Sequence, residues 1–316
     1  MKKLRQRGKL SFLTTDKTSL AMKTDDLEAF AAVVRHQSIS RAAQELGIAQ
    51  PLLSRRVQGL ETTLGVALFD RQSKPLRPTA TGLRLAQQCR SVLREVDILC
   101  EMAAANLPLN GNLRLGVTQS IGELVLDSLM GQLQQEWPDL RPQVSTGWGA
   151  ALIERVERGE LDAAVVLQGR GRSMPGNVEA KLLHRSRVAI LGRQGAWPRK
   201  RYALADCAET GWVLNPDGCG FRAGLQRALA GQGLPLHVRL DTFGKDLQLQ
   251  SAAKGVGLGL LPRPLYMNST FEGQLDELSL TDFKPEAEAW LVHGRNLNRL
   301  HEPIERIGQY VESALR

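Results

Sequence analysis

The chain has 316 residues, 42% of them hydrophobic, which predicts two or three globular domains and excludes a disordered protein. The longest apolar run, near residues 256–262, is far too short to span a bilayer. The basic first residues carry only the apolar stretch LSFL, which is too short for a signal peptide. We therefore expect a cytoplasmic protein with no membrane partner. The formal net charge of +8 is uneven, because residues 1–107 hold 17 Lys and Arg against 10 Asp and Glu, whereas residues 108–316 hold 24 against 23.

Residues 1–23 show no hydrophobic period and are expected to form a tail. Met22 stands directly before the first periodic segment, so a start-site extension is an equal alternative. Thr24 is expected to cap the first helix, whose first turn is acidic and complements the helix dipole. Ser40 is expected to cap a second, short helix, which Gly47 closes.

A third helix, AQPLLSRRVQGLETTLG, follows almost at once. Proline is tolerated only in the first turn of a helix, where Pro51 stands. The apolar stripe of this helix consists of Leu53, Val57, Leu60 and Leu64. At about 100° per residue, the opposite face carries Pro51, Ser54, Arg55 and Gln58.

A short helix, a glycine turn and a helix with a polar outer face are typical of a helix-turn-helix. Arg can bond guanine in bidentate fashion and Gln can bond adenine, as entry into a major groove requires. Ser38, Ser40 and Arg41 lie at the start of the preceding helix, where hydroxyls, N–H groups and a cation can hold phosphate. The basic first third suits a polyanionic partner, although a solubilising surface would show the same charge.

Residues 68–82, LFDRQSKPLRPTATG, predict a β-hairpin or wing, because Pro75 and Pro78 exclude a central strand. A long helix over about residues 81–106 follows. Its apolar residues step by four and three over roughly three heptads: Leu85, Cys89, Val92, Val96, Leu99 and Ala103. A heptad seam usually packs against a partner helix, so we expect a homodimer. Burial of this helix on its own domain is the alternative.

The turn-rich stretch NLPLNGN, residues 106–112, marks a boundary. Beyond it, predicted strands and helices alternate in two successive βαβ patterns, which indicate parallel sheets in two lobes with a cleft between them. Residues 116–123, GVTQSIGE, follow the first strand and open a helix, where the hydroxyls of Thr118 and Ser120 and free N–H groups suit a small anion. Ordinary N-capping would use the same residues.

Several motifs carry a family resemblance. Between Leu27 and Gly82 the chain contains SxSxAAxxL, QPxxSRxVxxLE, LGxxLFxR and a closing TxxG, and further on GNLRLGV, ERGELDAAVV and SAAKGVGLGLLP. Together these strings resemble LysR-type transcriptional regulators. The resemblance implies an α/β protein with an N-terminal winged helix-turn-helix, a long linker helix, and a two-lobed effector domain shaped like a periplasmic binding protein. Ser40 and Leu53 stand where the family often carries Thr and Val.

The resemblance also implies roles for single residues. Gln50, Pro51, Ser54 and Arg55 would contact operator bases from the recognition helix. Arg41, Arg56 and Arg71 would contact phosphates, with Lys74 and Arg77 on the wing. The effector would bind between the lobes, against Thr118, Gln119, Ser120, Thr146, Gly147, Trp148, Leu167, Gln168, Cys219, Arg222, Thr242 and Phe243. Trp148 suggests an aromatic or apolar group on the effector, and a packed surface tryptophan is the alternative.

We therefore expect a sequence-specific DNA-binding regulator modulated by a small, anionic effector. The expected domains are a tail at 1–23, a winged helix-turn-helix at 24–82, a dimerisation helix at 83–107 and an effector domain at 108–316. Its first lobe would hold about 112–190 and 265–316, and its second about 191–264. The expected partners are double-stranded DNA, the effector, and a second copy in a homodimer that assembles into a homotetramer. RNA polymerase is a further candidate partner.

Two other function classes stay open at this point. The cysteines Cys89, Cys100, Cys207 and Cys219 form no CxxC or zinc pattern, so free thiols and no cofactor are expected. Peroxide-sensing members of the family use two cysteines, which makes a redox sensor based on Cys219 and Cys207 an alternative. A two-lobed solute-binding protein is another. The histidines are scattered and no GxSxG motif is present, so we expect no enzyme.

Overall fold

The protein is described from a computed structural model that covers residues 22–70, 72–103 and 109–316. The contacts of the chain form two compact units, and the division falls in the sequence between Asp97 and Ile98. None of the helices in the described residues is long and apolar enough to cross a membrane.

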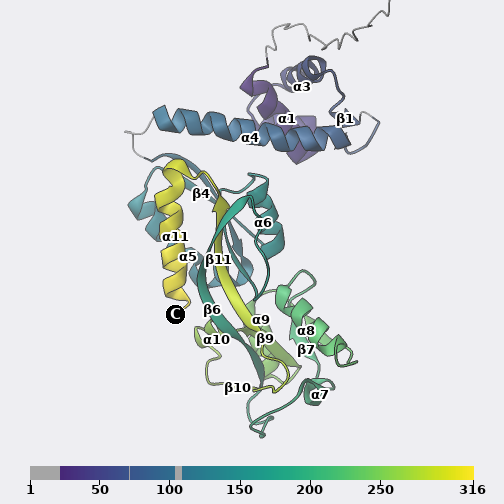
Figure 1. Ribbon diagram of the computed structural model, residues 1–316, viewed down its shortest axis with the longest axis vertical. Helices are drawn as coiled ribbons and strands as arrows, with labels where there is room; N and C mark the ends of the chain where they lie inside the picture. The colour runs from purple at the N-terminus through teal and green to yellow at the C-terminus, as the bar shows by residue number, and fades with distance from the viewer. Residues whose placement is uncertain (1–21, 71, 104–108) are drawn as a thin grey trace, which may run out of the picture. The chain divides into compact units, whose positions relative to one another are not determined.

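A three-helix core, a two-stranded wing and most of a long helix, as far as Asp97, make up the first unit (Figure 1). The elements are α1 (Thr24–His36), α2 (Ile39–Glu45), α3 (Gln50–Leu64), β1 (Phe69–Asp70), β2 (Arg77–Pro78) and α4 (Ala80–Ala103). Phe30 and Val33 of α1 lie with Leu53 and Leu60 of α3 in one buried cluster. The two strands pair antiparallel, so the predicted helix-turn-helix and wing are both confirmed.

Two helix caps differ from the prediction. The N-cap residue of α1 is Lys23, not Thr24. The Lys23 N–H donates a hydrogen bond to the Asp26 carboxylate at 3.2 Å. Ser38 caps α2, because its hydroxyl oxygen accepts a hydrogen bond from the Arg41 N–H at 3.4 Å, and Ser40 lies inside the helix. In both places several capping residue types stand close together, so the sequence leaves the cap position open by a residue or two.

Three contacts join α3, the wing and α4. The Glu61 carboxylate, near the end of α3, accepts a hydrogen bond from the Leu68 N–H at 2.8 Å. The Thr79 hydroxyl oxygen accepts one from the Gly82 N–H at 2.9 Å and so caps α4. A Cβ at Gly82 would lie 2.1 Å from the carbonyl oxygen of Leu68, so only glycine fits there. The LE and TxxG motifs therefore supply residues that hold α3, the wing and α4 together.

The heptad seam of α4 is divided. Leu85 and Cys89 pack on the cluster formed by α1 and α3. Val92 and Leu99 are exposed, Leu99 at 67% of its surface. The first half of the seam thus belongs to the core of its own unit, and the second half presents apolar side chains to the outside of the chain.

The second unit is a mixed α/β structure. Its first elements are β3 (Gly111–Thr118), α5 (Gln119–Glu136), β4 (Leu140–Gly147), α6 (Gly149–Glu157), β5 (Ala163–Gly169) and β6 (Val178–Arg193). Then come α7 (Leu204–Cys207), β7 (Trp212–Leu214), α8 (Gly220–Ala230), β8 (Val238–Asp241), α9 (Lys245–Ala253), β9 (Leu258–Pro262) and α10 (Arg263–Met267). The last elements are β10 (Leu275–Glu277), β11 (Glu286–Gly294), η1 (Asn298–Leu300) and α11 (His301–Ala314).

Nine strands form one continuous set in the order β4-β3-β5-β11-β6-β9-β7-β8, with β10 beside β6. The strands β3, β4 and β5 pair in parallel, as do β7, β8 and β9, which confirms the two predicted lobes. The long strand β6 pairs antiparallel with β11 through its first part and with β9 through its second part, and so passes from one lobe to the other (Figure 1). The sequence predicted the parallel pairing within each lobe, but it did not predict the antiparallel strands β6 and β11.

The boundary between the lobes also differs from the expected one. Residues from 265 onward were expected in the first lobe. Leu265 and Leu275 pack instead with Leu191 and Leu249, and Leu278 packs with the core around β7, so the chain stays in the second lobe until β11 begins. The first lobe is completed by α11, which lies beside α5 and shares its buried cluster (Figure 1).

Candidate functional site

The outer face of α3 presents polar side chains away from the helical core. Gln50, Pro51, Arg55 and Gln58 are exposed, and Ser54 is half-buried. Leu53, Val57 and Leu60 of the same helix are buried. The turn before α3 is made by Gly47 at φ 63°, a backbone conformation that favours glycine. The helix thus has one face fixed in the core and one face free to approach a ligand.

The start of α2 lies against the start of α3. The Ser40 hydroxyl donates a hydrogen bond to Oε1 of Gln50 at 3.0 Å, which joins the two helices. Ser38 caps its helix, while the Arg41 side chain is exposed. Of the three predicted phosphate-binding residues in this region, Ser38 and Ser40 therefore form hydrogen bonds within the motif, and Arg41 presents a cation at its surface.

Arg56 differs from its neighbour Arg55. Its guanidinium donates a hydrogen bond to Asp25 of α1 at 2.6 Å, and the side chain is only 24% exposed. Arg55 is exposed and forms no ion pair with any acidic side chain in the described parts of the chain. The sequence expected Arg56 to act as a phosphate clamp, but the structure shows it holding α1 against α3.

The wing carries two exposed cations, Lys74 and Arg77. The Ser73 hydroxyl oxygen accepts a hydrogen bond from the Arg77 N–H at 2.9 Å, and the Ser73 hydroxyl donates to the Asp70 carbonyl at 2.9 Å. The Ser73 side chain therefore holds the backbone of the wing tip. Arg71, the third predicted phosphate contact, lies outside the described residues.

The basic excess of the first third has a specific origin. Residues 1–21 hold 6 Lys and Arg and 1 acidic residue, a net charge of +5. Residues 22–107 hold 11 basic and 9 acidic residues, a net charge of +2. Overall charge therefore points only weakly to the helix-turn-helix itself, and the placement of Arg41, Arg55, Lys74 and Arg77 carries the electrostatic argument.

A cavity lies between the two lobes of the second unit. Six of its lining residues were predicted: Thr118, Gln119, Ser120, Trp148, Leu167 and Cys219. Six others were missed: Gly149, Asn215, Gly218, Gly220, Phe221 and Gly244. Each missed residue lies within four positions of a predicted one, in a loop or in the first turn of α6 or α8. A wider window around each predicted residue would have found them.

Thr118 provides a free donor in this cavity. It ends β3 and precedes α5, and only 7% of it is exposed. Its hydroxyl forms no hydrogen bond to the described residues, and it does not cap α5. A buried hydroxyl without a partner costs about 1–3 kcal/mol, which a bound acceptor would recover. Beside a helix N-terminus, the favoured acceptor is an anion.

Trp148 closes the cavity against the second lobe. Its ring stacks on Phe243 with the ring centres 6.0 Å apart. A Cβ at Gly218 would lie 2.6 Å from the same ring, so the indole rests directly on the backbone of that turn. The Trp148 ring forms one wall and offers an apolar surface to whatever the cavity holds, and Phe243 supports that ring from outside the lining.

Several predicted effector contacts do not line the cavity. The predicted residues that are absent from its lining are Thr146, Gly147, Gln168, Arg222, Thr242 and Phe243. Arg222 pairs with Asp241 and lies 3.1 Å from Asp217, so its charge is already compensated inside the second lobe. The Thr242 hydroxyl donates to the Phe243 carbonyl at 3.2 Å. The correct loops were identified, and the side chains of Arg222 and Thr242 have their partners outside the cavity lining.

The cavity holds only about 40 Å³. Sites for organic ligands usually measure about 300–1,000 Å³, and a single water occupies about 30 Å³. An organic molecule therefore requires the lobes to separate. Glu123 of α5 opposes this, because its carboxylate accepts a hydrogen bond from the Lys245 N–H of the second lobe at 3.2 Å.

Comparison with known proteins agrees with this architecture. Residues 24–83 match the family model of the bacterial regulatory helix-turn-helix protein, lysR family, and residues 107–314 match that of the LysR substrate binding domain. The HTH-type transcriptional regulator BbuR of Bordetella bronchiseptica is 28% identical over 93% of this chain and 90% of its own length. A probable hydrogen peroxide-inducible genes activator of Streptomyces viridosporus is 32% identical over 79% of this chain and 80% of its own.

A full-length OxyR variant from Pseudomonas aeruginosa has the same fold, with a TM-score of 0.72 at 21% identity over 92% of this chain and 98% of that one. The two family models together span nearly all of the described residues, and they match the same two units that the contacts separate. The chain therefore belongs to the LysR-type family of DNA-binding transcriptional regulators, with an N-terminal helix-turn-helix and a C-terminal effector-binding domain.

Proposed function

We propose that this regulator contacts operator bases through the outer face of α3 and phosphates through the wing. The supporting observation is the contrast on α3, where Leu53 and Val57 are buried while Arg55 and Gln58 are exposed. Arg41, Lys74 and Arg77 supply the phosphate contacts, because each is an exposed cation close to the helix-turn-helix or on the wing. Since DNA is the partner, the protein would work in the cytoplasm.

A small anionic effector would bind between the lobes and control this activity. Its acidic group would accept hydrogen bonds from Thr118 and from the first turn of α5, and its apolar part would lie against Trp148. Since the cavity is nearly closed, effector binding would select a more open arrangement of the lobes. The effector would shift the population of the lobes toward that open arrangement, and this shift would alter how the DNA-binding units are spaced.

The second half of α4 would form the dimer. Val92 and Leu99 repeat at heptad spacing and are exposed in the single chain. Two such helices, packed together, would bury them. Pairs of dimers would make the tetramer, and RNA polymerase would be contacted at the promoter.

Footprinting with purified protein tests the DNA contacts. Arg55→Ala is expected to cost about 1–3 kcal/mol and to relax selectivity at one base pair. Arg56→Ala is expected to leave the base preference unchanged and to lower the stability of the first unit, because Arg56 binds Asp25. The proposal fails if the protein gives no salt-sensitive, sequence-selective protection upstream of its own or neighbouring genes, or if the two variants change base preference equally.

A further inference from the structure

A second hollow lies at the side of α8 that faces the ends of β5 and β11. Its walls are residues 169–172 at the end of β5, residues 283–286 at the start of β11, and, from α8, Gly220, Phe221, Ala223, Gly224 and Arg227. It measures about 700 Å³, within the range of about 300–1,000 Å³ of organic ligand sites and far larger than the cavity between the lobes. We call it the α8 groove.

The α8 groove gathers positive charge. Arg170, Arg172, Arg227 and Lys284 line it, with Glu286 as the single acidic residue in the lining. Arg170 pairs with Glu286. The other three cations are exposed and have no acidic partner in the residues that the structure describes. Like charges gathered in this way repel one another, and an anion with two negative charges would relieve that repulsion.

The floor of the α8 groove is open and partly apolar. A Cβ built at Gly171 or at Gly224 would meet no atom within 4 Å. Phe221 and Phe283 are half-buried and pack on the core of the second lobe, with part of each ring surface in the lining. Small residues leave the space, and the rings offer an apolar contact next to the cations. That combination suits an organic anion better than an inorganic one.

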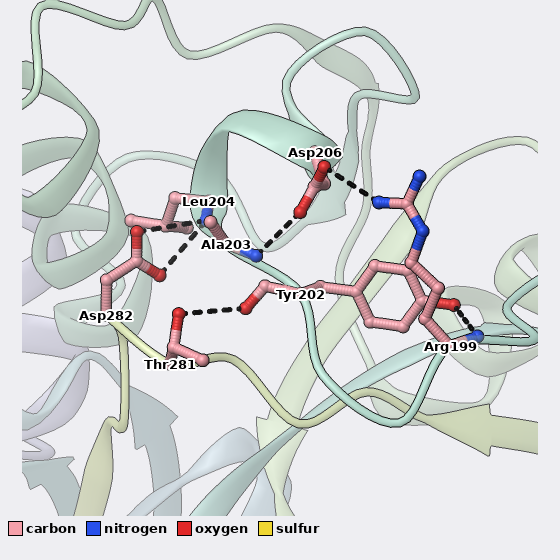
Figure 2. Close-up of polar contacts among 7 residues, drawn as sticks. All are labelled: Arg199, Tyr202, Ala203, Leu204, Asp206, Thr281 and Asp282. Carbon is pink, nitrogen blue, oxygen red and sulfur yellow. Dashed lines mark hydrogen bonds and ion pairs between the residues drawn. The ribbon is translucent and has the colours of Figure 1, made fainter.

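The wall that carries Phe283 and Lys284 is held in place (Figure 2). Thr281 donates through its hydroxyl to the Tyr202 carbonyl at 3.2 Å, and Asp282 accepts from the Leu204 N–H at 3.1 Å. Gln232 donates to the same carboxylate at 3.1 Å. In the same wall, the Pro285 carbonyl accepts a hydrogen bond from the Val188 N–H at 2.9 Å. A preformed wall lowers the entropy that binding would otherwise cost.

From these observations we propose that the α8 groove is a second ligand site, for a small organic anion with two negative charges and an aromatic or apolar group. This site is separate from the cleft of the proposed function and does not depend on it. Gly220 and Phe221 line both hollows, so a ligand in the groove touches the turn that closes the cleft. The Arg170 N–H also donates to the Glu286 carbonyl at 3.1 Å, where the chain passes between lobes.

Isothermal titration of the full chain with phenyl phosphate at low salt tests the proposal. We expect saturable binding that weakens as salt is added, because the three unpaired cations are exposed. Replacing two of them in Arg227→Gln/Lys284→Gln should weaken binding about ten-fold or more. The matched control is Arg141→Gln, which removes an exposed cation on β4, outside the groove lining, and should leave binding unchanged.

A second variant separates binding from folding. Gly224→Leu fills the open floor of the groove, and its helix position should make the fold no less stable. It should abolish the binding of phenyl phosphate. Unchanged binding in Gly224→Leu, or no binding by the native chain, would overturn the proposal. So would loss of binding in Thr118→Val with binding retained in Gly224→Leu, which places the anion in the cleft. Equal affinity for inorganic phosphate would also overturn the proposal, because it would show that the groove holds an adventitious ion only.

Discussion

Glu123 and Lys245 join the two lobes of the effector-binding domain. The Glu123 carboxylate stands at the N-terminus of α9 and accepts the Lys245 N–H at 3.2 Å, while its other oxygen accepts a hydrogen bond from Gln119 at 3.0 Å. A carboxylate at a helix N-terminus interacts favourably with the helix dipole. This contact stabilises the closed cavity, which is too small for an organic effector.

Glu123→Gln should therefore loosen the closed arrangement. The neutral amide accepts a weaker hydrogen bond and loses the interaction with the dipole of α9. We expect faster amide hydrogen exchange in the first turn of α9, measured by mass spectrometry. The control is Glu154→Gln, which removes a carboxylate that pairs only with Arg158 of its own lobe among the described residues. Equal exchange at α9 in both variants would show that Glu123 does not hold the lobes.

Gly82→Ala should destabilise the DNA-binding unit by about 1–3 kcal/mol, as overpacking of a tight contact does. The added Cβ would lie 2.1 Å from the Leu68 carbonyl oxygen, and backbone must move to accept it. Gly131→Ala is the matched control, because a Cβ there meets nothing within 4 Å, and it should stabilise α5 by about 0.5–1 kcal/mol. Urea denaturation measures both, and a neutral Gly82→Ala would contradict the geometry.

The sequence predicted the DNA-binding unit well because its signals are local. The period of α3 separates Leu53 and Val57 from Arg55 within a few residues, and no distant contact is needed to see it. The partner of Arg56 was missed for the opposite reason. Asp25 lies 31 positions away and meets Arg56 only when α1 packs on α3. The position of a charged residue on a helix face does not reveal whether it forms an ion pair with a residue of another helix.

The same limit applies to the effector-binding domain. The strands that pass between lobes were missed, since Glu288 of β11 pairs with Arg185 of β6, 103 positions away. The turns that line the cleft were found, because side chains at the ends of parallel strands meet at one edge of a sheet. Orientation within those turns was not predictable, and Arg222 turned toward Asp241 instead of the cavity.

Asp25→Asn should strengthen the binding of DNA of any sequence. Without the Asp25 carboxylate, Arg56 becomes available to phosphate, and each further phosphate contact steepens the dependence of log affinity on log salt by about 0.9. Glu28→Gln removes the same charge from an exposed position of α1 and controls for overall charge. Salt titrations by fluorescence anisotropy measure the slope. If both variants give the native slope, Arg56 stays within the protein when DNA binds.

Cys207 should be inert to oxidants in the folded protein. The side chain is fully buried, and burial, with the nearby Asp206 and Asp282 carboxylates, raises its pKa from 9.0 to about 12. The thiolate is the reactive form, and at about pH 8 only about one thiol in ten thousand would be ionised. Peroxide should therefore form no disulfide between Cys207 and Cys219, although Cys219 lines the cavity. Peptide mapping after peroxide treatment checks this, and such a disulfide would restore the redox-sensor hypothesis.

The raised pKa of Cys207 also predicts a dependence of stability on pH. The folded state keeps the thiol proton at a pH where the unfolded state releases it, so the stabilisation is complete below pH 9.0 and is lost as the pH rises toward about 12. Cys207→Ala should remove this contribution, and its free energy of unfolding should fall less steeply above pH 9.0 than that of the native chain. Urea denaturation of both proteins at several pH values isolates the thiol, because lysines and tyrosines titrate equally in each. Parallel curves would show that the Cys207 thiol ionises as readily in the folded protein as in the unfolded chain.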